Sequence, residues 1–110
     1  MKIRNFRKEI ISMDTNYYWI DEDSNGVVTI GLTDAGQNEL GNITFVSLPK
    51  VGDKLTTSDT LLDVEADKAV SDIDSPVAGT VVEINQQAQS NPSILNESDK
   101  SKSWIAKIQK

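Results

Sequence analysis

Lys68 is the residue of this chain whose type and surroundings could best support chemistry. A lysine amine is a nucleophile, so Lys68 could accept an acyl group if a partner enzyme can reach it. Small Ala69 would leave that approach open, while Glu65 and Asp67 would offer acidic contacts to a basic partner surface. The segment 67–69 by itself is typical of a solvated charged turn or helix face, so the assignment needs support from the rest of the sequence.

The charge around Lys68 is strongly acidic. Between residues 59 and 74 this one lysine is accompanied by six carboxylates, namely Asp59, Asp63, Glu65, Asp67, Asp72 and Asp74. The whole chain has a formal charge of −6, which argues against nucleic-acid binding because neutralising phosphates requires a basic face. We therefore expect protein partners rather than nucleic acid.

Two residue types that carry much enzyme chemistry are missing. The 110 residues contain no cysteine and no histidine, which removes thiol nucleophiles, thiolate metal sites and the commonest general base. A protein without catalytic or metal-binding residues of its own is therefore predicted. No apolar run approaches the roughly 20 residues of a membrane span or forms a signal peptide, so a cytoplasmic protein without membrane contact is expected.

The segment around Lys68 allows two local structures. Apolar residues at positions 62, 66, 69 and 73 have helical spacing, which favours an amphipathic helix ending before Pro76. The alternative is a pair of strands, Thr60–Ala66 and Ala69–Asp74, that meet at Asp67-Lys68. Because no Asn-Gly or Asp-Gly marks that turn, local patterns leave the helix slightly ahead.

Strand patterns surround this segment on both sides. The expected strands are residues 17–20, 27–32, 42–48, 79–85 and 104–108. Asn25-Gly26 is a strong hairpin signal between the first two, and Thr33 is suited to cap a short helix that Gly41 ends. Many short strands with turn signals close together predict a mostly β domain, either a sandwich or a flattened barrel, with one or two short helices.

Some details of packing can also be predicted. The strand 42–48 is apolar on both faces, with Ile43 and Phe45 on the same face. Trp19 is expected to pack in the core or at its rim, and Trp104 is expected in the core.

The organisation is that of a single domain, since domains cluster at roughly 100–150 residues. Residues 16–110 are expected to form this domain, with residues 1–15 as an extension. Within that extension, residues 1–12 are either an amphipathic helix or an added edge strand. The polar stretch 86–103 predicts a loop, in which a short piece with Pro92, Ile94 and Leu95 packs against the core.

The order and spacing of many residues resemble one known family over about residues 16–109. These residues are Gly31-Leu32-Thr33-Asp34, Gln37, Leu40-Gly41, Phe45-Val46, Leu48-Pro49, Val51-Gly52-Asp53, Val64-Glu65, Lys68-Ala69, Ser71-Asp72, Ser75-Pro76, Gly79, Val82-Glu83, Asn85, Pro92, Asn96 and Trp104. The chain resembles the glycine cleavage system H proteins. This resemblance, rather than local pattern, favours the hairpin at Asp67-Lys68.

The resemblance implies a lipoyl-domain-like fold, a barrel-sandwich hybrid, with lipoic acid in amide linkage to Lys68. Glu65, Asp67 and Ala69 would then form the hairpin that a lipoate-protein ligase or a lipoyl or octanoyl transferase recognises. In that family the lipoyl arm takes an aminomethyl group from glycine decarboxylase to aminomethyltransferase, and dihydrolipoamide dehydrogenase reoxidises it. The protein itself is a non-catalytic carrier.

Several departures from the family pattern keep other interpretations open. Tyr17 and Tyr18 stand where the family usually has His-Glu, and the chain ends at Lys110 without the acidic helical tail of ordinary members. One alternative is a specialised short H-like protein that serves a lipoate ligase and lipoyl-dependent ADP-ribosylation enzymes. Another is an unmodified acidic interaction module. Biotin is disfavoured, because biotinyl domains typically flank the lysine with methionines.

Overall fold

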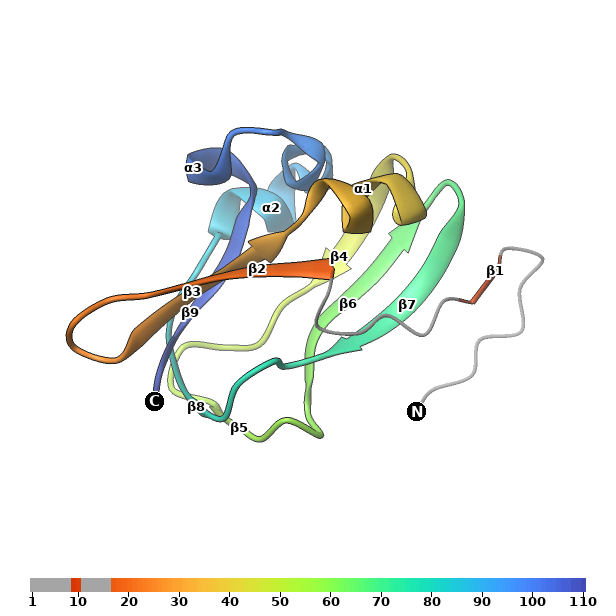
Figure 1. The fold of residues 1–110 in the computed structure, drawn as a ribbon. Helices are drawn as coiled ribbons and strands as arrows, with labels where there is room; N and C mark the ends of the chain where they lie inside the picture. The colour runs from red at the N-terminus through yellow and green to blue at the C-terminus, as the bar shows by residue number, and fades with distance from the viewer. Residues whose placement is uncertain (1–8, 11–16) are drawn as a thin grey trace.

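The computed structural model describes residues 9–10 and 17–110 and shows two facing β-sheets (Figure 1). In chain order the elements are β1 (Glu9–Ile10), β2 (Tyr18–Glu22), β3 (Val27–Leu32), α1 (Asp34–Leu40), β4 (Ile43–Ser47), β5 (Lys54–Leu55), β6 (Thr60–Ala66), β7 (Ala69–Asp74), β8 (Gly79–Ile84), α2 (Gln86–Ser90), η2 (Pro92–Asn96), α3 (Lys100–Ser103) and β9 (Trp104–Gln109). The strand orders are β1-β7-β6-β4 and β2-β3-β9-β8-β5. The predicted mostly β sandwich is confirmed, and the sheets do not close into a barrel.

The core lies between the sheets because alternate side chains of each strand point inward. Val28, Ile30 and Leu32 of β3 are at most 2 % exposed, and Leu62 and Val64 of β6 are fully buried against them within one hydrophobic cluster. With so few aromatic residues, branched aliphatic side chains provide most of this burial. The result is a stiff double layer whose ends can present turns to solvent.

Strand β4 differs from its prediction. Ile43 and Val46 are the buried residues of this strand, whereas Phe45 is 47 % exposed. The pairing of β4 with β6 shifts register between Ile43 and Phe45, and such an irregularity moves the following side chains to the opposite face. The prediction that Ile43 and Phe45 share a face is therefore wrong.

The stretch 86–103 is helical rather than a loop. It folds into α2, η2 and α3, so the described part of the chain has three short α-helices and one 3₁₀ helix, more than the one or two predicted. Leu95 is fully buried and Ile94 packs against the core, which confirms their predicted placement. Asn85 holds the end of this stretch, because its Nδ2 donates to the carbonyls of Lys102 and Trp104 at 3.0 and 2.8 Å.

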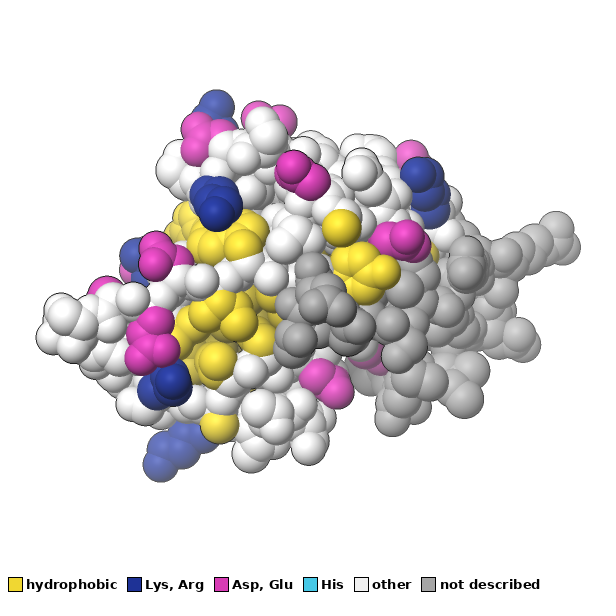
Figure 2. All heavy atoms as spheres, viewed as in Figure 1, with side chains coloured by type: hydrophobic (Ala, Val, Ile, Leu, Met, Phe, Trp, Pro, Cys, Tyr) yellow, Lys and Arg dark blue, Asp and Glu magenta, His cyan; other side chains and the backbone are white. Residues whose placement is uncertain are grey.

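Both tryptophans lie on the outer side of the five-stranded sheet. Trp104 is only partly buried and has the Lys107 Nζ atom 5.6 Å from its ring centroid, so its predicted core position is wrong. Trp19 covers Gly31 and has the Lys100 Nζ atom 5.0 Å from its ring centroid. Figure 2 shows hydrophobic side chains beside the β2–β3 hairpin, bordered by basic and acidic ones.

Of the predicted extension 1–15, only Glu9–Ile10 is described. It forms the edge strand β1, parallel to β7, with Glu9 opposite Ala69 and Ile10 opposite Val70. An edge strand is one of the two predicted alternatives. The predicted domain boundary at residues 15–16 falls outside the described residues.

Gly79 provides a test of how closely β8 and β9 approach. A Cβ atom at Gly79 would lie 2.3 Å from the Gln109 carbonyl oxygen, a backbone atom that cannot move without shifting β9. We expect Gly79→Ala to lower the free energy of unfolding by about 3 kcal/mol, measured by urea denaturation. Gly52→Ala is the control, since a Cβ there meets nothing within 4 Å and only its φ of +97° costs about 1 kcal/mol. Equal losses of unfolding free energy in Gly79→Ala and Gly52→Ala would contradict the close approach of β8 and β9 at Gly79.

Tyr18 provides a second test, because its side chain is 6 % exposed and its hydroxyl has no hydrogen-bond partner among the described residues. Burial raises the pKa of Tyr18 well above its usual value, and the charge of Asp74 raises it further. The folded protein therefore keeps the phenol proton while an unfolded chain loses it above about pH 10. Stability from this group is complete below that pH and declines as the pH rises further.

We expect Tyr18→Phe to remove an unpaired buried hydroxyl and to raise the free energy of unfolding by about 1 kcal/mol near neutral pH. The same substitution should reduce the loss of stability above about pH 10. Urea denaturation at both pH values measures these effects, with the half-buried Tyr17 changed to Phe as the control. A destabilised Tyr18→Phe variant with an unchanged alkaline profile would contradict the assignment.

Candidate functional site

The segment around Lys68 is a β-hairpin, as the resemblance predicted and the helical spacing did not. Strands β6 and β7 pair antiparallel, with Leu62 opposite Ile73 and Glu65 opposite Val70, and only Asp67-Lys68 connects them. The turn lies at the same end of the sandwich as α1 (Figure 1). The side chains of both turn residues are exposed.

The last residue of helix α1, and Asn42 two residues beyond it, support this turn through the backbone. The Asp67 N–H donates to the Asn42 carbonyl at 2.9 Å, and the Lys68 N–H donates to the Leu40 carbonyl at 3.1 Å. No non-glycine residue in the described ranges has a positive φ, so the turn is not the type I′ form that Asn-Gly favours. Contacts with α1 therefore replace the sequence signal that this hairpin lacks.

The Lys68 side chain lies along the end of the helix. Its Nζ donates to the Asn38 carbonyl at 3.0 Å. Its aliphatic part passes Gly41, where an added Cβ would be 3.0 Å from Lys68 Cγ and 3.4 Å from Cδ. Gly41 ends α1 with a φ of +75°, a conformation that glycine adopts without steric cost. One glycine thus ends the helix and makes room for the lysine.

This helix end is held in turn by η2. The Asn96 Nδ2 donates to the Gly41 carbonyl and its Oδ1 accepts from the Ile43 N–H, both at 2.8 Å. The Gln37 Nε2 donates to the carbonyls of Leu95 and Glu97, also at 2.8 Å. We call Gln37, Gly41 and Asn96 the platform. Sequence reasoning included all three in the resemblance and predicted that Gly41 ends the helix, which is confirmed, but it gave Gln37 and Asn96 no role. The distance along the chain between α1 and η2 hides their contacts.

The other predicted site residues divide into exposed and buried ones. Asp67 is exposed beside Lys68, and Glu65 is half-buried on β6. Ala69 is fully buried in the hydrophobic core, as is Ala66. The hairpin therefore presents Asp67, Lys68 and part of Glu65 to a partner, while Ala69 contributes by packing the base of the turn.

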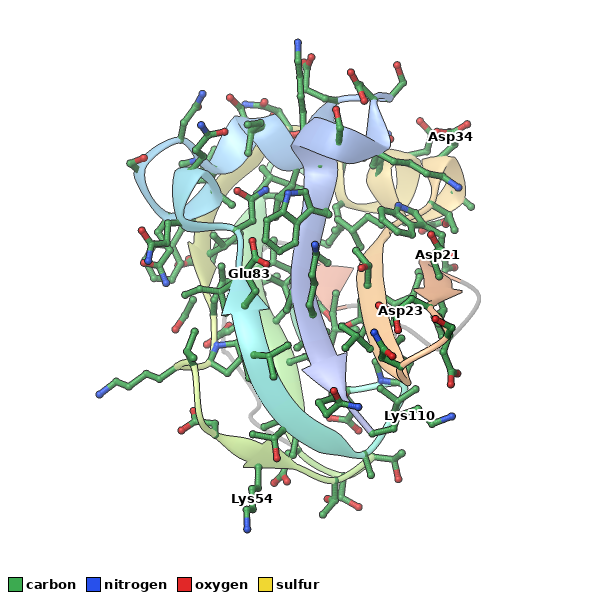
Figure 3. All side chains as sticks on the ribbon, turned by 90° about the vertical axis from the view of Figure 1, so that its left-hand side faces the viewer. Asp21, Asp23, Asp34, Lys54, Glu83 and Lys110 are labelled. Carbon is green, nitrogen blue, oxygen red and sulfur yellow. The ribbon has the colours of Figure 1, made fainter. Side chains whose placement is uncertain are left out.

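A separate open hollow of about 720 Å³ lies along the outer face of the five-stranded sheet, lined by Trp19, Trp104, Lys100 and Lys107 among others. Its Glu83, labelled on β8 in Figure 3, has its carboxylate 3.7 Å from Lys107 Nζ. The residues lining it do not include Asp67 or Lys68.

Among the residues that the structure describes, no helix is long and apolar enough to cross a membrane.

A lysine on a hairpin turn at one end of two facing sheets is the arrangement predicted for a lipoyl-domain-like sandwich. The family model for the glycine cleavage H-protein matches residues 11–110. A glycine cleavage system H protein of Aliivibrio fischeri is 41 % identical over 98 residues, which are 89 % of this chain and 78 % of that protein. One of Staphylococcus epidermidis is 43 % identical over 91 residues, covering 83 % and 71 %.

The fold agrees with this comparison. The crystal structure of a glycine cleavage system H protein from Mycobacterium marinum superposes with a TM-score of 0.78 at 30 % identity, covering 87 % of this chain and 80 % of that one. The chain belongs to the glycine cleavage H-protein family.

Asn96 is the residue through which the platform can be tested. Asn96→Ala leaves the Gly41 carbonyl and the Ile43 N–H without their partner. We expect the free energy of unfolding to fall by about 2 kcal/mol in urea denaturation. Asn91→Ala is the matched control, because the exposed Asn91 side chain contacts only the Ser93 hydroxyl among the interactions described for it. A loss at Asn96 no larger than that at Asn91 would contradict the platform.

Proposed function

We propose that this protein is a lipoyl carrier of glycine cleavage, with lipoic acid in amide linkage to Lys68. The observation that carries the proposal is the exposed Lys68 amine on a two-residue turn, backed by α1, in a chain of the H-protein family. The residues fit such a group, because Gly41 leaves the space along the lysine side chain that any Cβ would take. When bound, the lipoyl group would supply a dithiolane whose S–S bond opens, so that one of its sulfur atoms can carry an aminomethyl group.

The contribution of this chain is to hold and display the attachment point. The paired strands and the two backbone hydrogen bonds to Leu40 and Asn42 fix the base of the turn, while the Lys68 amine remains accessible. Asp67 and the exposed part of Glu65 would meet a basic surface on an enzyme that modifies the lysine. Charge complementarity of this kind mainly sets partner choice and encounter rate.

The partners follow from the family role. A lipoate-protein ligase, or a lipoyl or octanoyl transferase, would modify Lys68. Glycine decarboxylase, aminomethyltransferase and dihydrolipoamide dehydrogenase would then use the arm in turn, in the cytoplasm as the sequence predicts. The similarity to proteins named glycine cleavage system H proteins supports this role over ADP-ribosylation or an unmodified interaction module.

The modification can be tested by intact mass after incubation with lipoate, ATP and a lipoate ligase. We expect one lipoyl adduct on the unaltered protein and none on Lys68→Arg, because a guanidinium keeps the charge but is not acylated. Lys54→Arg is the control and should retain the adduct, since Lys54 projects from the opposite end of the sandwich (Figure 3). An adduct that persists on Lys68→Arg would refute the site.

The role in glycine cleavage needs a second measurement. Glycine decarboxylase should load an aminomethyl group onto the lipoylated protein in the presence of glycine, detected by a further increase in mass. Failure of a fully lipoylated sample to accept this group would argue against glycine cleavage and in favour of the specialised lipoyl role.

A further inference from the structure

Lys68 contacts the end of α1 through two donors. Its backbone N–H donates to the Leu40 carbonyl, and its Nζ donates to the Asn38 carbonyl at 3.0 Å. Both carbonyls belong to the last turn of a helix, where carbonyl groups have no partner within the helix. The lysine therefore supplies hydrogen bonds that α1 itself cannot make.

Gly41 determines whether the lysine side chain can lie in this place. An alanine Cβ there would approach Lys68 Cγ to 3.0 Å, which is tighter than ordinary van der Waals contact. The platform residue Asn96 fixes the Gly41 carbonyl at 2.8 Å, so the glycine cannot easily move away. The space for the lysine side chain is thus set by backbone that η2 holds in position.

We propose that the end of α1 is a positioning site for the Lys68 nitrogen, before and after acylation, with the Asn38 carbonyl as the acceptor and Gly41 as the residue that makes room. The proposal rests on the proposed function, because it concerns the same lysine. Asn38 and Gly41 are positioning residues. Neither needs to touch the acyl donor.

The number of hydrogens on the Lys68 nitrogen explains why one acceptor can bind both the free amine and the acylated amide. A neutral amine has two N–H bonds and one lone pair, so donating one N–H to Asn38 leaves the lone pair free for an acyl adenylate. A C–N bond then forms, the bond from the acyl carbon to the phosphate oxygen breaks, AMP leaves with that electron pair, and the nitrogen loses one proton to water or to the ligase. The amide keeps a single N–H, the one that donates to Asn38.

The hydrogen bond from the side-chain amide to the Asn38 carbonyl would hold the base of the lipoyl arm in one position. The side chain of an acylated lysine would otherwise sample many rotamers, which costs conformational entropy whenever a partner enzyme binds the arm. Holding the amide against α1 removes part of that freedom in advance. The distal end of the arm stays free to enter partner active sites.

The test uses an isotope-labelled acetyl-lysine placed at position 68 during translation, so that the side-chain amide forms without a ligase. We expect its N–H to exchange with water about fivefold more slowly than in free acetyl-lysine, measured by NMR. Gly41→Asn should restore the faster exchange, because its side chain would take the space along the lysine side chain, although the φ of +75° and ψ of −155° at this position strain any residue other than glycine. Backbone amide spectra check that the variant is folded.

Gly52→Asn is the matched control, since Gly52 also has a positive φ but an added Cβ there meets nothing within 4 Å. It should leave the exchange slow. Exchange at the rate of free acetyl-lysine in the unaltered sequence, or slow exchange in Gly41→Asn, would overturn the positioning site. Because this amide needs no ligase, absence of lipoylation by a ligase would refute the proposed function and leave this result standing.

Discussion

The structure depends on the contact between the end of α1 and the Asp67-Lys68 turn. Two backbone hydrogen bonds, to the Leu40 and Asn42 carbonyls, hold a two-residue turn that has no glycine and no positive φ. Without them, the turn would have to find its own partners in water, and the tight connection of β6 to β7 would lose its support. The helix in turn is fixed by Asn96, which contacts the backbone on both sides of Asn42.

This arrangement suits the display of one lysine at the end of the sandwich. The sheets bury a continuous aliphatic core, and the hairpin extends that core to its base through the buried Ala66 and Ala69. Beyond these alanines only Asp67 and Lys68 connect the strands, so the packed core ends at the base of the turn that carries Lys68. The acidic surroundings then distinguish Lys68 from the other lysines for any partner with a basic surface.

Much of the fold could be predicted from residue patterns, but the hairpin that carries Lys68 could not. The apolar positions 62, 66, 69 and 73 have the spacing of a helix, but in the structure this spacing arises because they are placed symmetrically about the turn. Leu62 lies opposite Ile73, and Ala66 and Ala69 are both buried. A long-range contact with α1 stabilises the turn, and no local signal records it. The same reason hides Asn96, whose partners lie more than fifty residues away, and η2, whose Leu95 is fully buried in the core.

Hydrogen exchange at the backbone amides of Asp67 and Lys68 tests the central claim most directly. If α1 holds the turn, both amides exchange slowly, at rates close to those of the neighbouring strand residues, because opening them requires separating the hairpin from the helix. Exchange as fast as that of an unstructured surface loop would mean that the turn is not held, and the account of a rigidly displayed lysine would fail.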